Sequence, residues 1–112
     1  MTDAAPCCPP LLGPTLDEPD AEALAVMLKA LADPVRLRLV NLIATAPEGE
    51  VCACDLPEQL GRSQPTISHH LSLLTRAGIV DRDQRGRWAW FRLRSEQLAA
   101  LCVALDPACA TR

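Results

Sequence analysis

The sequence contains no run of about 18 apolar residues, the length that a transmembrane helix needs. Its first residues, MTDAAPCCPPLLGPTLDEPD, have neither the basic segment nor the apolar segment of a secretory signal peptide. These absences argue against a membrane protein and an exported one, and they predict a cytoplasmic protein. Thiols stay reduced in that compartment. The six cysteines are therefore expected to be metal ligands, redox groups or packed core residues rather than structural disulfides.

The sequence also lacks the residue patterns of common catalytic sites. No glycine-rich loop of the kind that cradles phosphate groups is present. The two histidines, His69 and His70, lie in a different segment from the cysteines, so a Cys–His nucleophilic pair is not expected. The sequence predicts a binding protein rather than an enzyme.

What the sequence does contain is an uneven distribution of charge, hidden within a net charge of −3. Residues 1–22 hold five acidic residues and no base, whereas residues 62–94 hold seven arginines and two aspartates. A basic region within an acidic chain is a candidate surface for binding phosphate groups. Because five prolines fall within residues 1–19, we predict a flexible arm over 1–19, one folded domain over 20–106 and a tail over 107–112.

Residues 20–78 carry the signals of successive helices. Apolar residues at helical spacing run through AEALAVMLKALA and then through PVRLRLVNLIATA, which opens with proline directly after Asp33, a typical N-cap. A short helix is predicted from Asp55, with Glu58 completing a capping box, and it ends at Gly61. Ser63 then opens a longer helix. A short helix, a tight turn and a second helix form the helix-turn-helix pattern.

The rest of the folded part is predicted to be a β-hairpin followed by a last helix. Two β-type runs within residues 79–93 flank a loop at 84–87. The helix SEQLAALCVAL follows, with Ser95 as its N-cap and Cys102 on its apolar face, in the core or in a dimer interface. Cys109 has no assigned role. This order predicts a mainly α fold with a β-hairpin wing, the winged helix-turn-helix.

The helix predicted over residues 63–77 has the features of a DNA-recognition helix. Ile67, Leu71 and Leu74 share one face and are expected to pack inward. The other face carries polar side chains suited to base edges and phosphates, and two arginines flank the hairpin tip. We therefore predict contacts with double-stranded DNA from Gln64, Thr66, Ser68, His69, Ser72, Arg85 and Arg87. An ordinary solvated polar face is the alternative interpretation.

Four cysteines form two tight clusters, Cys7-Cys8 in the predicted arm and Cys52-Ala-Cys54 before the short helix. Thiolates prefer soft metal ions, and a pair near a helix can converge with a pair on a flexible arm around one ion. The alternatives are a dithiol that closes to a disulfide on oxidation, or thiols that simply pack as small hydrophobic groups.

Residues 22–105 resemble the ArsR/SmtB family of metal-responsive repressors. The resemblance rests on the segments LKALADPVRLRLVNLI, VCACDL, LGRSQPTISHHLSLLTRAGIV and QRGRW. It implies a homodimer, joined mainly through the first and last helices, that represses transcription. It also implies that the dimer leaves its operator DNA on binding a metal ion or metalloid.

The pair Cys52-Ala-Cys54 resembles the Cys-x-Cys of the arsenic-, cadmium- and lead-sensing members. The common arsenic pattern has a further cysteine three residues later, where this sequence has Pro57, and this difference favours ligands from the arm. The resemblance thus implies As(III) or Sb(III) as inducer of resistance genes, bound by Cys7, Cys8 and a third ligand, either Cys52 or Cys54, of which Cys52 is favoured. Cys54 is a candidate fourth ligand. Cd(II) or Pb(II) at four thiolates is one alternative, and a thiol redox response is another.

Overall fold

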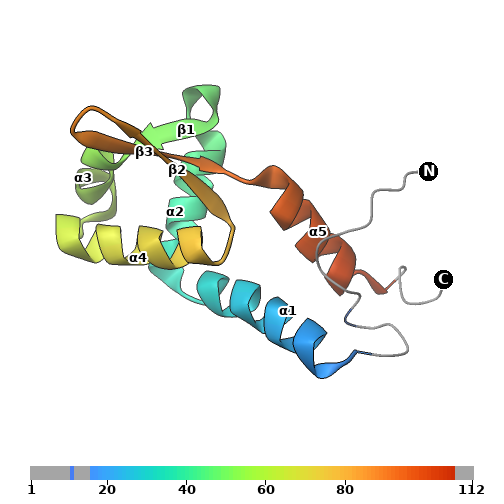
Figure 1. Ribbon diagram of the computed structural model, residues 1–112. Coiled ribbons are helices and arrows are strands. Elements are labelled where there is room, and N and C mark those ends of the chain that lie inside the picture. The colour runs from blue at the N-terminus through green and yellow to red at the C-terminus, as the bar shows by residue number, and fades with distance from the viewer. Residues whose placement is uncertain (1–10, 12–15, 108–112) are drawn as a thin grey trace.

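The computed structural model describes Leu11 and residues 16–107 of the chain (Figure 1). Cys7, Cys8 and Cys109 lie outside the described residues. Within the described part the elements follow the order α1 (Glu18–Leu31), α2 (Pro34–Thr45), η1 (Pro47–Gly49), β1 (Glu50–Cys52), η2 (Ala53–Asp55), α3 (Leu56–Leu60), α4 (Gln64–Arg76), β2 (Val80–Arg85), β3 (Trp88–Leu93) and α5 (Ser95–Leu105). This confirms the predicted mainly helical fold with a β-hairpin wing.

Two of the predicted helix starts have the expected caps. The carboxylate of Asp33 accepts hydrogen bonds from the backbone N–H groups of Val35 and Arg36, at 2.9 and 3.1 Å, and Pro34 is the first residue of α2. The hydroxyl of Ser63 accepts from the backbone N–H of Thr66 at 3.4 Å and so caps α4. No helix in the described residues is both long and apolar enough to cross a bilayer.

Two other predicted caps differ from the structure: Asp55 is at the N-cap position of α3 but makes no capping hydrogen bond, and Ser95 is not a cap. Asp55 lies in the 3-10 turn η2 with helical backbone angles, and its side chain makes no capping hydrogen bond to α3. The backbone N–H of Leu56 instead donates to the carbonyl of Ala53, because α3 continues directly from that turn. Ser95 is the first residue of α5 rather than its cap, and Arg94 occupies the N-cap position.

The predicted hairpin is present, and a third strand joins it. β2 and β3 pair from Val80–Leu93 to Arg85–Trp88 around a two-residue turn, in which Gly86 has a φ of 63°. β1, which was not predicted, pairs antiparallel with β3 and gives the sheet order β1-β3-β2. Cys52 therefore lies on an edge strand, opposite Trp90.

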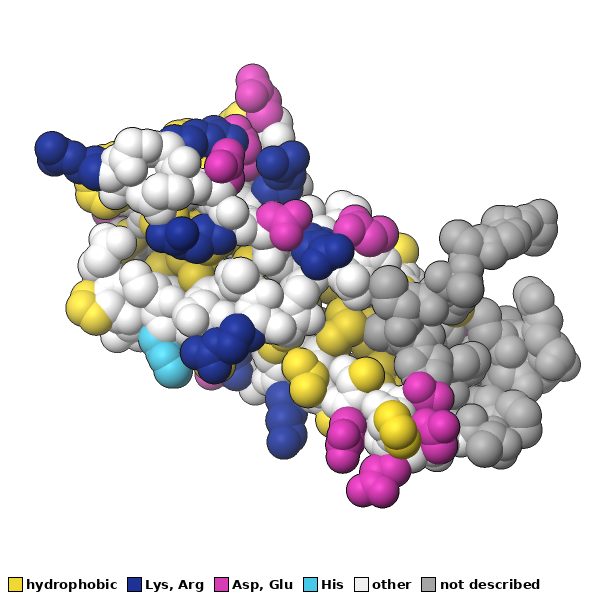
Figure 2. Space-filling model, viewed as in Figure 1, with side chains coloured by type: hydrophobic (Ala, Val, Ile, Leu, Met, Phe, Trp, Pro, Cys, Tyr) yellow, Lys and Arg dark blue, Asp and Glu magenta, His cyan; other side chains and the backbone are white. Residues whose placement is uncertain are grey.

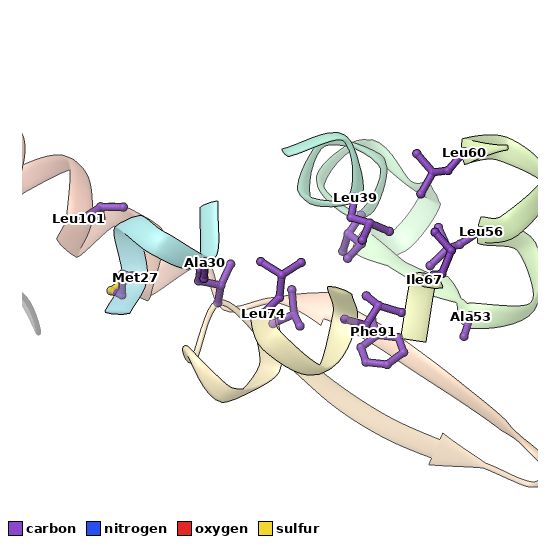
Figure 3. Packing of buried hydrophobic residues seen from close by; sticks show 14 of the residues in the cluster. Met27, Ala30, Leu39, Ala53, Leu56, Leu60, Ile67, Leu74, Phe91 and Leu101 are labelled. Atoms are coloured by element: carbon purple, nitrogen blue, oxygen red, sulfur yellow. The ribbon is translucent and has the colours of Figure 1, made fainter. Parts of the chain in front are cut away.

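The core fixes the position of α4 beneath the sheet. Ile67, Leu71 and Leu74 are at most 2% exposed, as the spacing predicts. Figure 3 shows Ile67 and Leu74 beside Phe91 of β3, with Leu39, Leu56 and Leu60 above them in this view and Met27 and Leu101 at the far left. Gly61, with a φ of 64°, ends α3 in the left-handed conformation and so sets the turn between α3 and α4.

Arg36 joins three helices below this core. Its guanidinium donates hydrogen bonds to the carbonyls of Ala30 at 2.6 Å and Lys29 at 3.3 Å, and to Nδ1 of His70 at 3.0 Å. The end of α1, the start of α2 and the middle of α4 are thus connected through one side chain. His70 is committed to this contact, whereas its neighbour His69 is exposed.

Candidate nucleic-acid interface and thiol site

The polar face of α4 is exposed to solvent. The five side chains predicted to contact DNA from this helix are all exposed: Gln64, Thr66, Ser68, His69 and Ser72. Their exposure follows from the buried stripe on the opposite side of the helix. Figure 2 shows Lys and Arg side chains spread over the hairpin and α4, with acidic side chains interleaved on the hairpin. The acidic side chains also gather at the N-terminal end of α1.

The two hairpin arginines differ in their surroundings. Arg87 lies exposed in the turn between β2 and β3. Arg85 donates two hydrogen bonds to the carboxylate of Glu50, at 2.7 and 3.0 Å, and a third to Asp83 at 2.9 Å. Its guanidinium carbon also lies 4.8 Å from the ring centroid of Trp90. Arg85 is therefore tied to the sheet instead of extending from it.

The Arg85 contacts change the acidity of the groups involved. The hydrogen bond from Arg85 lowers the pKa of the Glu50 carboxyl below its usual value, and the Arg85 charge adds to this effect. The same contact with Glu50, followed by the one with Asp83, raises the pKa of Arg85. Sequence reasoning missed Glu50 and Trp90, because Glu50 is 35 residues from Arg85 and only the unpredicted strand β1 brings them together.

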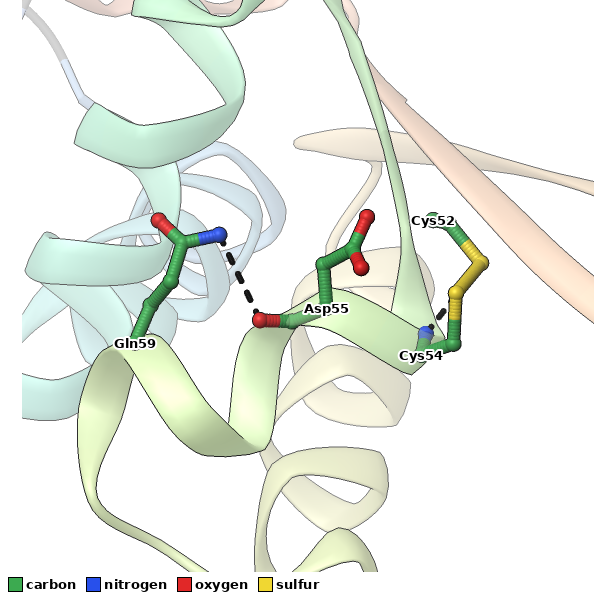
Figure 4. The surroundings of a disulfide bond; sticks show 4 residues. All are labelled: Cys52, Cys54, Asp55 and Gln59. Carbon is green, nitrogen blue, oxygen red and sulfur yellow. Dashed lines mark hydrogen bonds between the residues drawn. A yellow bond between two sulfur atoms is a disulfide. The ribbon is translucent and has the colours of Figure 1, made fainter.

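Cys52 and Cys54, hereafter the thiol pair, meet beside α3. They are joined as a disulfide across η2, with their Cα atoms 5.2 Å apart (Figure 4). The backbone N–H of Cys54 points at the sulfur of Cys52, at 3.2 Å. The sequence predicted reduced thiols here, with closure to a disulfide on oxidation as an alternative, and the tight turn brings the two sulfurs close enough for that bond. Cys52 is buried and Cys54 is exposed.

A cleft of about 540 Å³ opens next to the thiol pair. It lies between the end of α2, β1 and the start of α3, and its walls include Leu42, Glu48, Glu50, Cys52, Asp55 and Trp90. Among the described residues no group of three or more His, Cys, Asp or Glu side chains is arranged to bind a metal ion. Only in its reduced form would the thiol pair offer two soft sulfur ligands, and the predicted ligands Cys7 and Cys8 lie outside the described residues.

Cys102 is exposed on α5, so its predicted place in the core of the single chain is wrong. Apolar side chains are exposed around it and on the neighbouring helix α1. Val103 and Leu105 are 38% and 41% exposed on α5, and Val26 is 52% exposed on α1. These exposed apolar side chains support the alternative prediction that Cys102 lies in a dimer interface.

The sequence matches a protein-family model described as "Bacterial regulatory protein, arsR family" over residues 33–82. It is 43% identical over 82 residues to the arsenical resistance operon repressor of Escherichia coli, covering 73% of this chain and 68% of that protein. It is 39% identical over 88 residues to the biofilm growth-associated repressor of Xylella fastidiosa, covering 79% of this chain and 75% of that one.

Solved structures with the same architecture include a homodimeric winged helix-turn-helix DNA-binding domain from Mycobacterium bovis, determined by NMR and described as a possible ArsR-family transcriptional regulator. The two superpose with a TM-score of 0.63 at 28% sequence identity, covering 72% of each chain.

Proposed function

Because this chain belongs to the ArsR family of bacterial regulators, which are DNA-binding proteins and not enzymes, we propose that it is an arsenic-responsive transcriptional repressor. In this proposal the ligand-free protein binds operator DNA, and it leaves the DNA when As(III) or Sb(III) binds to cysteine thiolates. Genes for resistance are then transcribed.

The observation that carries the arsenic proposal is the convergence of two sulfurs beside α3. The thiol pair lies directly before the helix that precedes α4, so a ligand there acts on the helix-turn-helix itself. In the reduced pair, each thiol that replaces a hydroxide of arsenous acid releases one water and forms an arsenic–sulfur bond. The arm cysteines Cys7 and Cys8 are proposed to supply the remaining sulfur ligands. The E. coli relative, named for arsenical resistance, supports this choice of inducer.

The proposed DNA contacts follow from the exposed polar face of α4 and the hairpin turn. A recognition helix presents its N-terminal residues to base edges in the major groove, and exposed arginines bind phosphates. We assign base or phosphate contacts to Gln64, Thr66, Ser68, His69, Ser72 and Arg87. Arg85, also predicted as a contact, is bonded to two carboxylates, and its role is taken up below.

We also propose a homodimer joined through α1 and α5. The exposed apolar side chains on these two helices are what such an interface would bury. A dimer would place two copies of α4 on one duplex, in successive turns of the major groove. The homodimeric M. bovis domain supports this arrangement.

A thiol redox response is the second candidate function, and the disulfide between Cys52 and Cys54 favours it. Oxidation by a peroxide would convert the two thiols into one disulfide and reduce hydrogen peroxide to two waters. The DNA would then be released by the oxidant instead of by a metalloid. Both candidates use the thiol pair, and the arsenic candidate also needs Cys7 and Cys8.

The test is fluorescence anisotropy of a labelled duplex covering the promoter of the gene for this chain. The fully reduced protein is bound to the DNA and titrated with sodium arsenite, antimonyl tartrate, cadmium chloride or hydrogen peroxide. We expect arsenite and antimonyl tartrate to release the DNA from wild type and from the control Cys102→Ser. We expect no release from Cys52→Ser or from the double variant Cys7→Ser/Cys8→Ser.

Other outcomes assign the function differently. Release by cadmium but not by arsenite would favour the four-thiolate alternative. Release by peroxide alone would favour the redox candidate. If none of the four reagents released the DNA, the thiols would have no sensing role and the arsenic proposal would be wrong.

A further inference from the structure

A network of charged and aromatic side chains on the outer face of the sheet is not used by the function proposed above. Arg85 of β2 reaches across β3, stacks on Trp90 and binds Glu50 of β1 with two parallel hydrogen bonds. A bidentate ion pair combined with stacking on an aromatic ring fixes an arginine in one orientation. These three residues, hereafter the relay, connect the hairpin to the strand that contains Cys52.

The strand register places the relay in contact with the surroundings of Cys52. Glu50 and Cys52 are two residues apart on β1, so their side chains are directed to the same face of the sheet. Across the strands, Cys52 pairs with Trp90. Glu50, Cys52 and Trp90 also line the same cleft. A conformational change at Cys52 can therefore reach the relay by two routes, along β1 to Glu50 and across the strand pairing to Trp90.

We propose that the relay transmits a change at the thiol pair to the hairpin. Arg85 then acts as a positioning residue for the wing instead of a free phosphate contact. This inference rests on the proposed function in one respect, since it takes the thiol pair as the sensor. It adds how the sensor reaches the part of the protein that meets the DNA backbone.

The hydrogen bonds of Arg85 explain why the relay can act as a switch. Three of the five N–H groups of a guanidinium are used here, two on Glu50 and one on Asp83. Two carboxylates oppose its single charge, which leaves little attraction for a phosphate while the contacts last. Movement of β1 away from β2 would break the bidentate pair. The hairpin end, where Arg85 adjoins the turn that contains Arg87, would then lose its fixed position.

The experiment compares two variants that lose the same charge on the same stretch of chain. Glu50→Gln removes the carboxylate that binds Arg85, and Glu48→Gln removes an exposed carboxylate that lines the same cleft. DNA affinity is measured by anisotropy on the promoter duplex, with and without saturating sodium arsenite. The ratio of the two affinities measures the coupling between thiol pair and DNA, which in allosteric proteins is on the order of 5- to 150-fold.

We expect arsenite to lower the affinity of wild type and Glu48→Gln about 100-fold, and that of Glu50→Gln less than about 10-fold. The ligand-free affinity of Glu50→Gln should fall toward that of arsenite-bound wild type, because without the bidentate pair the hairpin end has no fixed position. Arg85→Lys keeps the charge but cannot form the bidentate pair, so it should show the same loss of coupling. It serves as a second variant if Glu50→Gln folds poorly.

Tryptophan fluorescence tests whether arsenite still binds in the variants. The chain has two tryptophans and no tyrosine, so Trp88→Phe leaves Trp90 as the single reporter, directly opposite Cys52. In this background arsenite should change the Trp90 emission whether residue 50 is Glu or Gln. That result would show that Glu50→Gln still binds arsenite and that its defect lies in the transmission from the thiol pair to the DNA.

A peroxide titration separates the failure of this inference from the failure of the proposed function. The peroxide titration uses a background in which serine replaces Cys7, Cys8, Cys102 and Cys109, whereas the arsenite titration keeps all six cysteines. If arsenite releases the DNA equally from wild type and from Glu50→Gln, the relay proposal is wrong and the arsenic proposal stands. If only peroxide releases the DNA from wild type, and it fails to release the DNA from Glu50→Gln, the relay proposal stands and the arsenic proposal is wrong. If neither reagent releases wild type, both are wrong.

Discussion

At the scale of single residues, Asp33 shows how one carboxylate both starts a helix and responds to pH. The hydrogen bond from the backbone N–H of Arg36 holds the pKa of the Asp33 carboxyl below its usual value. The charge of Arg36 and the second backbone hydrogen bond, from Val35, act in the same direction. A group with a lowered pKa in the folded state stabilises the fold at pH values where it is ionised in both states.

We predict that this contribution disappears in acid. It is fully present above the pKa of an unfolded aspartate, about 4, and it is lost as the pH falls through the lower pKa of the folded state. Thermal melts followed by circular dichroism between pH 2.5 and pH 7 should show a smaller acid-induced fall in Tm for Asp33→Asn than for wild type. Asn can still cap the helix but does not titrate. An equal acid-induced fall in Tm for the two proteins would show that Asp33 does not contribute to the pH dependence of stability.

Arg85 is the residue for which the sequence and the structure lead to different roles. From the sequence alone, an arginine near a hairpin tip is a predicted phosphate contact. The structure commits its donors to Glu50 and Asp83, and Glu50 comes from a strand of only three residues. A strand this short gives no alternation pattern to recognise. The contact therefore could not have been predicted from local sequence.

At the scale of elements, α4 was the most predictable part of the chain. Its cap, its buried stripe at spacings of four and three, and its left-handed glycine boundaries are all local signals that the structure confirms. The start of α3 was also predicted correctly, with Asp55 at the N-cap position, but the expected side-chain cap is absent. The sequence around Asp55 fits a capping box, but the preceding turn η2 already provides a carbonyl for the first helical N–H. Tertiary pairing of β1 with β3 sets that turn.

The cap of α4 gives a prediction for stability. Ser63→Ala removes the oxygen that accepts from the N–H of Thr66, and we expect the free energy of unfolding to fall by about 1 kcal/mol. Ser68→Ala is the matched control, because Ser68 is exposed within the helix and alanine favours helix. Urea denaturation followed by circular dichroism measures both. A fall as large in Ser68→Ala would show that the effect is not one of capping.

The hairpin turn gives a prediction for DNA binding. If Arg87 binds one phosphate, Arg87→Ala should weaken binding to all sequences and reduce the slope of log K against log salt by about 0.9. Lys29→Ala is the control, since it removes one exposed positive charge from α1. Anisotropy titrations at several salt concentrations give both slopes. An unchanged slope in Arg87→Ala would remove Arg87 from the set of phosphate contacts.

At the scale of the whole molecule, the helices of the proposed dimer interface and the sensing elements occupy different ends. Figure 1 shows α1 and α5 at one end of an elongated molecule, with α3 and the hairpin tip at the other. The exposed apolar side chains of α1 and α5 could be assigned to an interface only through the family resemblance. Apolar spacing alone cannot distinguish a face that packs in the core from one that packs on a second subunit.

We predict that a charge on this exposed apolar face dissociates the dimer. Val26→Glu introduces a carboxylate at a side chain that is 52% exposed on α1 and would be buried between subunits. Leu37→Glu introduces the same charge at a side chain that is 53% exposed on α2, outside the proposed interface. Sedimentation equilibrium should give a monomer for the first variant and a dimer for the second. If both variants were dimers, or both were monomers, the interface would not be at the proposed face of α1 and α5.

The contacts of Arg36 have a consequence for the spacing of the DNA sequence that such a dimer would recognise. Because one guanidinium ties the last turn of α1 to α4 through His70, the helix proposed to join the subunits and the helix proposed to enter the groove move as one body. The distance between the two half-sites is then set where the subunits meet, and the bases within each half-site are chosen by α4. Selection of binding sites from a random DNA pool should therefore return altered spacing for repacked interfaces and altered bases for α4 variants.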